Sequence, residues 1–294
     1  MQKTQIEWAD YTWNPISGCS PASEGCNNCY AARIANRFKG TPAFPDGFKV
    51  TPHPERLDEP RKLKGKGKRI FVCSMSDIFH PDVPDGFIEQ IFKVMRETPQ
   101  HAFFVLTKRP ERMVGKNWAV DFERHTPDRP YVSNWYAPNI WVGVSVENQA
   151  AADKRIPVLI DLFIAHRFVS VEPMLGPVNL TIIPANCKGV DGADVPEDYF
   201  SALNGWTYDP QESQHGRRMF NHLDWVIAGA ESGPGKRECR TEWACKLWHQ
   251  CKVAKVPFFF KNYNDIRDAN CAFDGEWPCP HDREWPKGVS NEAK

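Results

Sequence analysis

The sequence has no apolar run close to the about 20 residues that a membrane-spanning helix needs, and its first residues do not form a secretory signal. We therefore expect a cytoplasmic protein with no membrane attachment. The formal net charge is zero, so no overall positive field attracts nucleic acid. A local basic patch at residues 61–69 remains possible, with a solvated loop as the alternative.

The composition has no bias typical of a disordered or fibrous chain, since 41% of the residues are hydrophobic and 25% are charged. A chain of 294 residues can form one α/β barrel domain with insertions. Thiols stay reduced in the cytoplasm, so the ten cysteines indicate metal or catalytic chemistry before disulfides.

Short apolar segments rich in β-branched and aromatic residues recur along the chain and predict buried parallel strands. They are residues 70–73, 102–106, 140–144, 167–171, 225–228 and 256–260. Apolar residues with helical spacing lie between them, at 85–98 and 241–254. This alternation predicts an α/β fold built from βαβ units, and we expect a partial or full (β/α) TIM-type barrel.

Two regions depart from this alternation. Residues 174–222 are rich in Gly, Pro, Asp and Asn and are too long for a simple connection. We expect them to form an insertion over the active-site rim, as a lid or a recognition element. The barrel domain is then residues 1–262, and residues 263–294 are an irregular C-terminal tail packed on it.

Polar residues follow the predicted strands, at the edge where α/β barrels and sheets bind ligands. Those of interest are Ser76, Asp77, Lys108, Arg109, Ser145, Glu147, Asn148, Glu172 and Glu231. The alternative is that loops are polar for solubility alone. Lys108 and Arg109 are suited to an anion, or else to a salt bridge with Glu111. Glu147 and Glu172 have their own alternative, a buried carboxylate paired with a Lys or Arg of the barrel.

Three cysteines, Cys19, Cys26 and Cys29, lie close together with the spacing C-x6-C-x2-C, in a glycine-containing loop before a predicted helix. Three converging thiolates suit a metal. Closed zinc and iron–sulfur sites take four protein ligands, so a set of three indicates an open coordination position.

The cysteine triad followed by Tyr30 resembles a widened form of the radical S-adenosylmethionine (SAM) motif, whose usual spacing is C-x3-C-x2-C. From about residue 7 to residue 262 the chain also resembles a phage-associated family of three-cysteine-motif proteins, a domain of unknown function. The matching stretches are Thr12–Pro15, Gly25–Ala31, Ser74–His80, Thr107–Met113, Gly143–Glu147, Glu172–Pro177, Glu231–Gly235 and Pro257–Lys261.

The resemblance implies a [4Fe–4S] cluster on Cys19, Cys26 and Cys29, with SAM chelating the open iron. Reduction by an electron donor such as flavodoxin or ferredoxin would cleave SAM and yield a 5′-deoxyadenosyl radical, which abstracts a substrate hydrogen. The protein positions the reactants and excludes side reactions.

Under this interpretation the polar strand ends hold SAM and the substrate. Ser76 and Asp77 are expected near the SAM amino group, and Tyr30 is also expected to bind the cofactor. Ser145, Glu147 and Asn148 are suited to the ribose hydroxyls, and Glu172 to the adenosine or the substrate. Lys108 and Glu231 join the three cysteines as the expected catalytic residues.

We therefore predict a radical SAM enzyme, with an isomerase acting on a hypermodified pyrimidine in phage DNA as the suggested reaction. A flipped base would stack on aromatic residues, and the insertion offers Phe200, Trp206 and Tyr208 beside Arg217 and Arg218. Two alternatives remain. One is a structural zinc site on the cysteines and a nearby His, in a nucleic-acid-binding or partner-binding module. The other is a non-catalytic accessory protein. Separately, Cys271 and Cys279 are either a second metal site or plain thiols.

Overall fold

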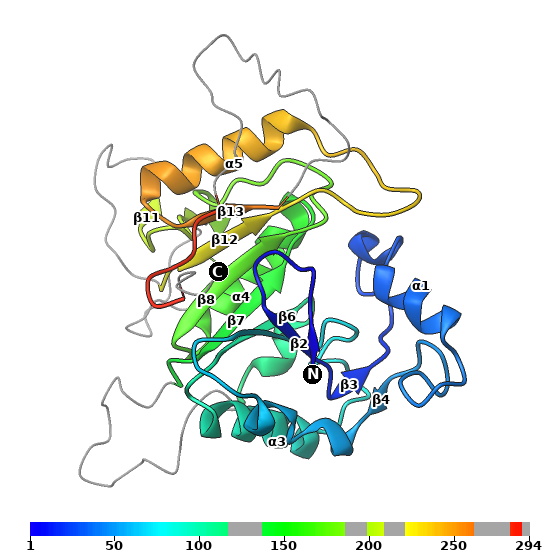
Figure 1. Ribbon diagram of the computed structural model, residues 1–294. Helices are drawn as coiled ribbons and strands as arrows, with labels where there is room; N and C mark the ends of the chain where they lie inside the picture. The colour runs from blue at the N-terminus through cyan, green and yellow to red at the C-terminus, as the bar shows by residue number, and fades with distance from the viewer. Residues whose placement is uncertain (117–136, 186–198, 209–220, 262–282, 290–294) are drawn as a thin grey trace, which may run out of the picture. The chain divides into compact units, whose positions relative to one another are not determined.

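The computed structural model describes residues 1–116, 137–185, 199–208, 221–261 and 283–289 (Figure 1). These residues fall into two compact units. Unit 1 comprises Met1–Gly143 and Leu162–His166, and unit 2 comprises Val144–Asp161 and Arg167–Lys294.

The core of unit 1 is a parallel sheet made of β2 (Tyr11–Trp13), β5 (Arg69–Val72) and β6 (Ala102–Thr107) in that order. Tyr11 pairs with Ile70, and Arg69 with Ala102, in parallel register. All of β5 is buried, as expected for a parallel strand covered on both faces. β1 (Gln2–Lys3) adds an antiparallel edge to β2.

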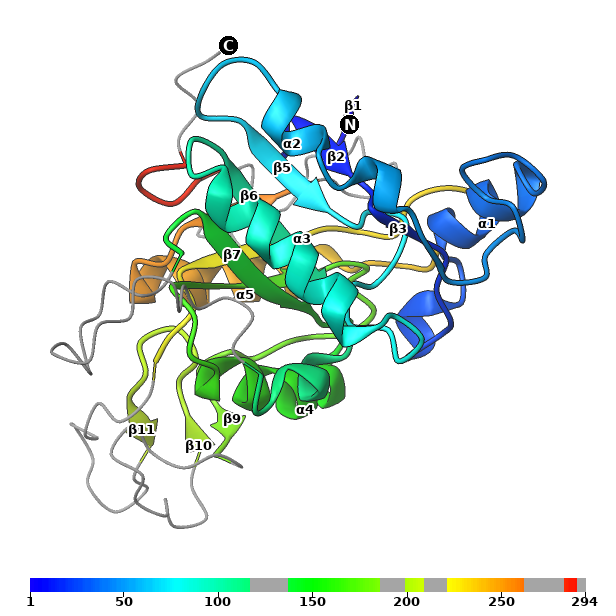
Figure 2. The ribbon, with the colours of Figure 1, turned by 90° about the horizontal axis from the view of Figure 1, so that it is seen from below.

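One face of this sheet is covered by α3 (Asp85–Glu97), which Figure 2 shows in front of the strands. The apolar positions of α3, Phe87, Ile88, Ile91, Phe92, Val94 and Met95, are buried. Their helical spacing is the signal by which the sequence predicts this helix. The remaining elements of unit 1 are short: β3 (Ile16–Ser17), η1 (Glu24–Cys26), α1 (Tyr30–Arg37), β4 (Thr51–Pro52), η2 (Pro54–Arg56), α2 (Glu59–Lys62) and η3 (Pro110–Met113).

Unit 2 also has a parallel sheet, formed by β8 (His166–Val171), β12 (Trp225–Ala228) and β13 (Phe258–Phe260). The helices in the described part of this unit are α4 (Gln149–Asp161) and α5 (Thr241–Ala254). β7 (Ile140–Ser145) is divided between the units at Gly143.

Part of the predicted insertion forms a small antiparallel sheet in unit 2, in the order β11 (Thr207–Tyr208), β10 (Tyr199–Phe200) and β9 (Ile183–Pro184). The sequence pattern does not predict these two-residue strands. Residues 283–289 lie against β13 and α5, where the backbone N–H of Glu284 donates to the carbonyl of Phe258 (3.0 Å) and Lys252 pairs with the Glu284 carboxylate (2.5 Å).

The predicted α/β class is confirmed, since a parallel sheet with helices forms the core of each unit. The barrel geometry and the expected boundary at residue 262 stay predictions. In the described part of the chain, no helix is long and apolar enough to cross a membrane.

Candidate functional site

The cysteine loop of unit 1 runs from Cys19 to Cys29, and its start requires glycine. Gly18 has φ +82°, and a Cβ there would lie 2.1 Å from the carbonyl oxygen of Lys49. Only glycine adopts this conformation with so close a backbone neighbour. The loop ends at Cys29, the N-cap position of α1, which makes no side-chain capping hydrogen bond, so the chain enters a helix immediately after the third thiol.

Hydrogen bonds fix this loop to the segment that follows β5. The backbone N–H of Gly18 donates to the carbonyl of Met75 (3.0 Å), and the Ser76 hydroxyl donates to the carbonyl of Gly18 (2.7 Å). At the far end, the Tyr30 hydroxyl donates to the carbonyl of Ser74 (2.5 Å). The cysteine loop thus lies at the carboxyl end of a buried parallel strand, the edge at which α/β sheets bind ligands.

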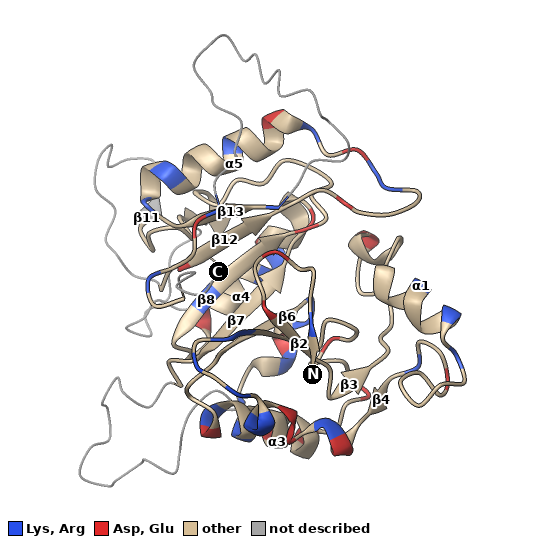
Figure 3. Cartoon of the chain, in the orientation of Figure 1, with Lys and Arg blue, Asp and Glu red and all other residues tan. Residues whose placement is uncertain are grey.

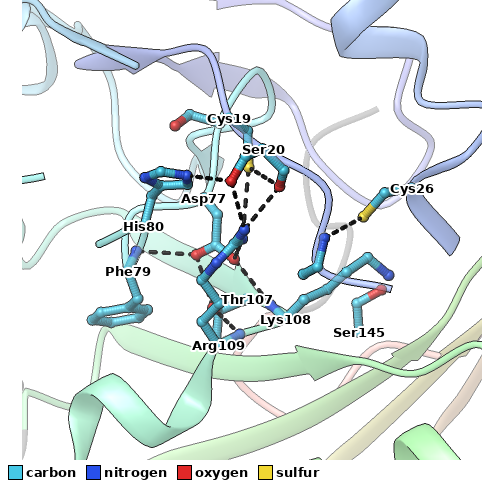
Figure 4. Close-up of polar contacts among 12 residues, drawn as sticks. Cys19, Ser20, Cys26, Asp77, Phe79, His80, Thr107, Lys108, Arg109 and Ser145 are labelled. Carbon is cyan, nitrogen blue, oxygen red and sulfur yellow. Dashed lines mark hydrogen bonds and ion pairs between the residues drawn. The ribbon is translucent and has the colours of Figure 1, made fainter. Parts of the chain in front are cut away.

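Asp77, 7% exposed, connects this segment to the end of β6 (Figure 4). Its Oδ1 accepts hydrogen bonds from the backbone N–H of Phe79 (3.0 Å) and the Thr107 hydroxyl (2.8 Å). Its Oδ2 accepts from the backbone N–H of Lys108 (3.1 Å) and from Arg109 Nη1 (3.2 Å). The four donors satisfy the carboxylate and hold two strand ends together.

Arg109 connects this hydrogen-bond network to Cys19, as Figure 4 shows. Its Nη1 lies 3.6 Å from the Cys19 sulfur, and its Nη2 donates to the carbonyl of Ser20 (2.8 Å). Burial, and next the negative charge of Asp77, raise the pKa of the Cys19 thiol to about 11, while the guanidinium acts in the opposite direction. Arg109 is therefore placed to stabilise negative charge on this sulfur.

His80 holds the same loop from another side. Its Nδ1 accepts a hydrogen bond from the backbone N–H of Asp82 (3.1 Å), which assigns the proton to Nε2. Nε2 then donates to the Ser20 hydroxyl (2.7 Å). Burial above all, and next the charge of Arg109, lower the pKa of His80, so the neutral ring that this bonding needs is favoured.

The donor set of the cysteine loop fits a thiophilic metal in its chemistry. All three cysteines are free and half-buried, and Cys26 accepts a hydrogen bond from the backbone N–H of Ala22 (3.4 Å). N–H donors to the sulfurs are among the features that tune iron–sulfur sites. Among the described residues, however, no three Cys, His, Asp or Glu side chains are gathered as a ready metal site.

The predicted residues of unit 2 form a second polar group. Glu147 is 1% exposed and pairs with Arg155 through Oε2 and Nη1 (2.8 Å). The same Nη1 donates to the carbonyl of Ser145 (2.6 Å), whose hydroxyl donates to the carbonyl of Glu172 (3.1 Å). Asn148 accepts a hydrogen bond from the backbone N–H of Ala151 (2.9 Å) at the start of α4.

The carboxylates of Glu172 and Glu231 also have cationic partners. Glu172 pairs with Lys261 (2.5 Å), beside Gly229, where a Cβ would lie 3.1 Å from the Lys261 Cβ. Glu231, 7% exposed, accepts hydrogen bonds from the Arg237 guanidinium (2.5 and 3.0 Å) and backbone N–H (2.9 Å). The alternative interpretation, a buried carboxylate paired with a Lys or Arg, therefore describes Glu147, whereas Glu172 has such a partner but is only half-buried. Ligand binding by both stays a prediction.

Several residues of both groups have roles that the sequence analysis missed. Ser20, His80 and Thr107 lie within or beside the quoted motifs, but nothing in their spacing shows their mutual hydrogen bonds. Arg155 follows Glu147 by eight residues on the next helix, a spacing that offers a weak signal. Arg237 follows Glu231 in an irregular segment and gives none.

The aromatic residues proposed for base stacking have different environments. Phe200 is fully buried, so the expectation that it stacks on a base is wrong, because its ring is part of the core of unit 2. Trp206 is 39% exposed and remains available. The side chain of Tyr208, together with Arg217 and Arg218, lies outside the described part, as do both cysteines of the possible second metal site, Cys271 and Cys279.

Comparison with solved structures gives weak matches to spore photoproduct lyase. One, complexed with dinucleoside spore photoproduct, has a TM-score of 0.37 at 10% identity and covers 58% of this chain, which spans 48% of that chain. A cysteine-to-serine mutant gives 0.40 at 9% identity, and a doubly substituted mutant with bound AdoMet and dinucleoside spore photoproduct gives 0.40 at 10%. For both mutants the match extends over 90% of this chain and over 79% of the mutant's own chain. Likenesses of this size carry no argument about the reaction of this chain.

No curated protein matches the sequence. A family profile, in contrast, matches residues 3–281, which include the cysteine loop and all the residues of both polar groups. The chain therefore belongs to the family described as "Protein of unknown function (DUF5131)".

Proposed function

We propose that this protein is a radical SAM enzyme, in which Cys19, Cys26 and Cys29 hold a [4Fe–4S] cluster. The observation that carries the proposal is the attachment of the cysteine loop to the carboxyl ends of β5 and β6. Bonds from Ser76 to Gly18 and from Arg109 to Cys19 and Ser20 make that attachment. Three free thiols at such an edge occupy the usual ligand-binding position of an α/β sheet.

When bound, the cluster supplies one-electron chemistry that cleaves SAM. The chain's own residues would hold the cluster and orient SAM. Arg109 donates to the Cys19 sulfur and is itself held by Asp77, so its guanidinium offsets part of the cost of a negative charge on that sulfur when a metal binds. Because no ready metal group exists in the described residues, the loop between Cys19 and Cys29 has to bring its thiols together when the metal binds.

The remaining predicted residues have distinct tasks in this proposal. Lys108 meets the carboxylate of SAM or a substrate anion, and Ser76 and Tyr30 fix the loop beside the SAM amino group. In unit 2, Ser145 and Asn148 serve the ribose hydroxyls, and the Glu172 and Glu231 carboxylates serve the adenosine or the substrate. Glu147, fully engaged by Arg155, acts as a positioning residue that holds the end of β7.

We further propose that the reaction is an isomerisation of a hypermodified pyrimidine in phage DNA, in the cytoplasm of a host cell, with the barrel closing fully or in part around the site. This substrate comes from the resemblance to phage-associated three-cysteine-motif proteins. An exposed Trp206 supports it to the extent that base stacking needs an accessible aromatic ring.

Anaerobic turnover tests the proposal. After incubation with iron and sulfide, the protein should cleave SAM when dithionite is added, and deuterium placed on a DNA substrate should appear in 5′-deoxyadenosine. Cys26→Ala should abolish SAM cleavage, whereas Cys245→Ala, which removes a buried thiol of unit 2, should retain it. A protein that binds zinc and leaves SAM intact would be the zinc module instead. A folded Cys26→Ala protein that retains its biological function would be an accessory protein.

A further inference from the structure

The helix that follows the cysteine loop carries large apolar side chains on its outer surface. Tyr30, Ile34 and Phe38 are 40%, 37% and 48% exposed, whereas Ala31 and Ala35 are buried. Residues four apart lie about 40° from each other around a helix axis, so Tyr30 and Ile34 share one side of α1. Phe38, the C-cap residue, follows directly after the helix, and we call these three exposed side chains the α1 stripe. Exposed apolar surface of this kind, when contiguous, marks an interaction site.

The α1 stripe has a positive border. Arg33, Arg37 and Lys39 are exposed, and residues 30–45 contain no Asp or Glu. The Arg37 guanidinium lies 5.7 Å from the centroid of the Phe38 ring, and Figure 3 shows Lys and Arg in blue toward the end of α1. Aromatic residues and arginine around an apolar centre are typical of the residues that dominate protein–protein binding.

We propose that the α1 stripe is the docking site of an acidic one-electron carrier protein that reduces the metal centre on the cysteine loop. This inference rests on the proposed function. In each encounter one electron leaves the reduced carrier and enters the cluster, so the carrier is oxidised and the cluster reduced by one electron, with no atom transferred.

The position of α1 next to the cysteine loop supports an electron carrier as the partner. α1 begins at Tyr30, directly after Cys29, and the stripe extends only about 12 Å along the axis. A carrier bound there lies next to the cysteine loop. The hydroxyl of Tyr30 is held by Ser74, which restrains the ring at the end of the stripe nearest the thiols.

The size and chemistry of the surface also favour a transient protein partner. Redox encounter complexes have small interfaces, below about 1,200 Å², as a helix of eight residues would provide. An aliphatic side chain such as Ile34 gains from burial against another apolar surface, which a phosphate backbone does not offer. The basic border complements an acidic carrier and makes binding weaken with salt.

The test measures the affinity of an acidic flavodoxin for the full chain, by calorimetry at low salt. Arg33→Glu/Arg37→Glu and Ile34→Ala/Phe38→Ala should each weaken Kd at least tenfold. Lys64→Glu/Lys66→Glu makes the same change in net charge at exposed positions of the loop after α2, and should leave Kd within twofold. SAM cleavage driven by dithionite should be unchanged in all three variants, and cleavage driven by flavodoxin should slow only in the first two.

Equal affinity in all variants, or equal weakening in the control, would overturn the inference. It would also be overturned if the stripe variants lost self-association in sedimentation, or lost DNA binding, while flavodoxin bound normally. Wild-type protein that fails to cleave SAM with dithionite contradicts the proposed function separately, because the flavodoxin affinity is measured without turnover.

Discussion

Removing the Asp77 carboxylate should destabilise unit 1 and loosen the cysteine loop. Asp77→Ala leaves the Thr107 hydroxyl, two backbone N–H groups and the Arg109 guanidinium without their acceptor. The side chains of Asp77 and Arg109 are 9% and 11% exposed. Breaking a buried pair on one side costs about 3–5 kcal/mol, and each neutral donor left alone adds to that cost unless water replaces the carboxylate. We expect a loss of at least about 3 kcal/mol in the free energy of unfolding.

Urea unfolding followed by circular dichroism measures this loss as a lower midpoint at unchanged slope. Asp77→Asn, which keeps one acceptor oxygen, should lose about 1.5–3 kcal/mol. Asp82→Ala is the control, since that side chain is 75% exposed and should change stability by at most about 0.5 kcal/mol. Alkylation of Cys19 should be faster in Asp77→Ala, because Arg109 no longer holds the loop. A loss below about 1 kcal/mol for Asp77→Ala, or an equal loss for Asp82→Ala, would refute this reasoning.

Three further predictions concern other parts of the chain. Glu147→Ala leaves the buried Arg155 guanidinium without its carboxylate partner and should lower the free energy of unfolding, measured by chemical denaturation, by about 3–5 kcal/mol. The exposed control Lys154→Ala should lose at most about 0.5 kcal/mol, and equal losses would contradict the prediction. Burial lowers the pKa of His101, so the unfolded chain takes up a proton first as pH falls below about 6.5. Stability present above that pH should then decline by up to about 1.4 kcal/mol per pH unit, and His101→Asn should flatten the decline; an unchanged pH profile would rule this out. Gly18→Ala places a Cβ against the carbonyl oxygen of Lys49 at φ +82°, so the free energy of unfolding should fall by at least about 1–3 kcal/mol and the protein should retain less iron. Wild-type stability and iron content in this variant would disprove the constraint.

The larger elements could be predicted from sequence because their own residues determine them. The predicted strand at residues 225–228 and the helix at 241–254 coincide with β12 and α5, and α3 ends one residue before the prediction. β2 was missed because three residues are too few to show a period. α4 was missed because Pro157 interrupts a helix that is apolar on most sides.

The candidate site was predictable in its residue types and less so in its bonding. The polar strand ends were identified because they interrupt apolar segments, and the cysteines because of their spacing. Their partners were not, because tertiary folding brings them from afar: Arg109 lies 90 residues from Cys19, and Lys261 lies 89 from Glu172. The sequence leaves undecided whether Glu147 can bind a ligand, and in the folded chain this carboxylate pairs with Arg155.

The most direct test of the central claim is the metal that Cys19, Cys26 and Cys29 bind. The full chain, purified without oxygen and supplied with iron, sulfide and zinc together, should retain about four iron atoms per molecule, show broad visible absorption that bleaches with dithionite, and lose both in Cys26→Ala. About one zinc per molecule and a colourless protein, with the same zinc lost in Cys26→Ala, would contradict the claim.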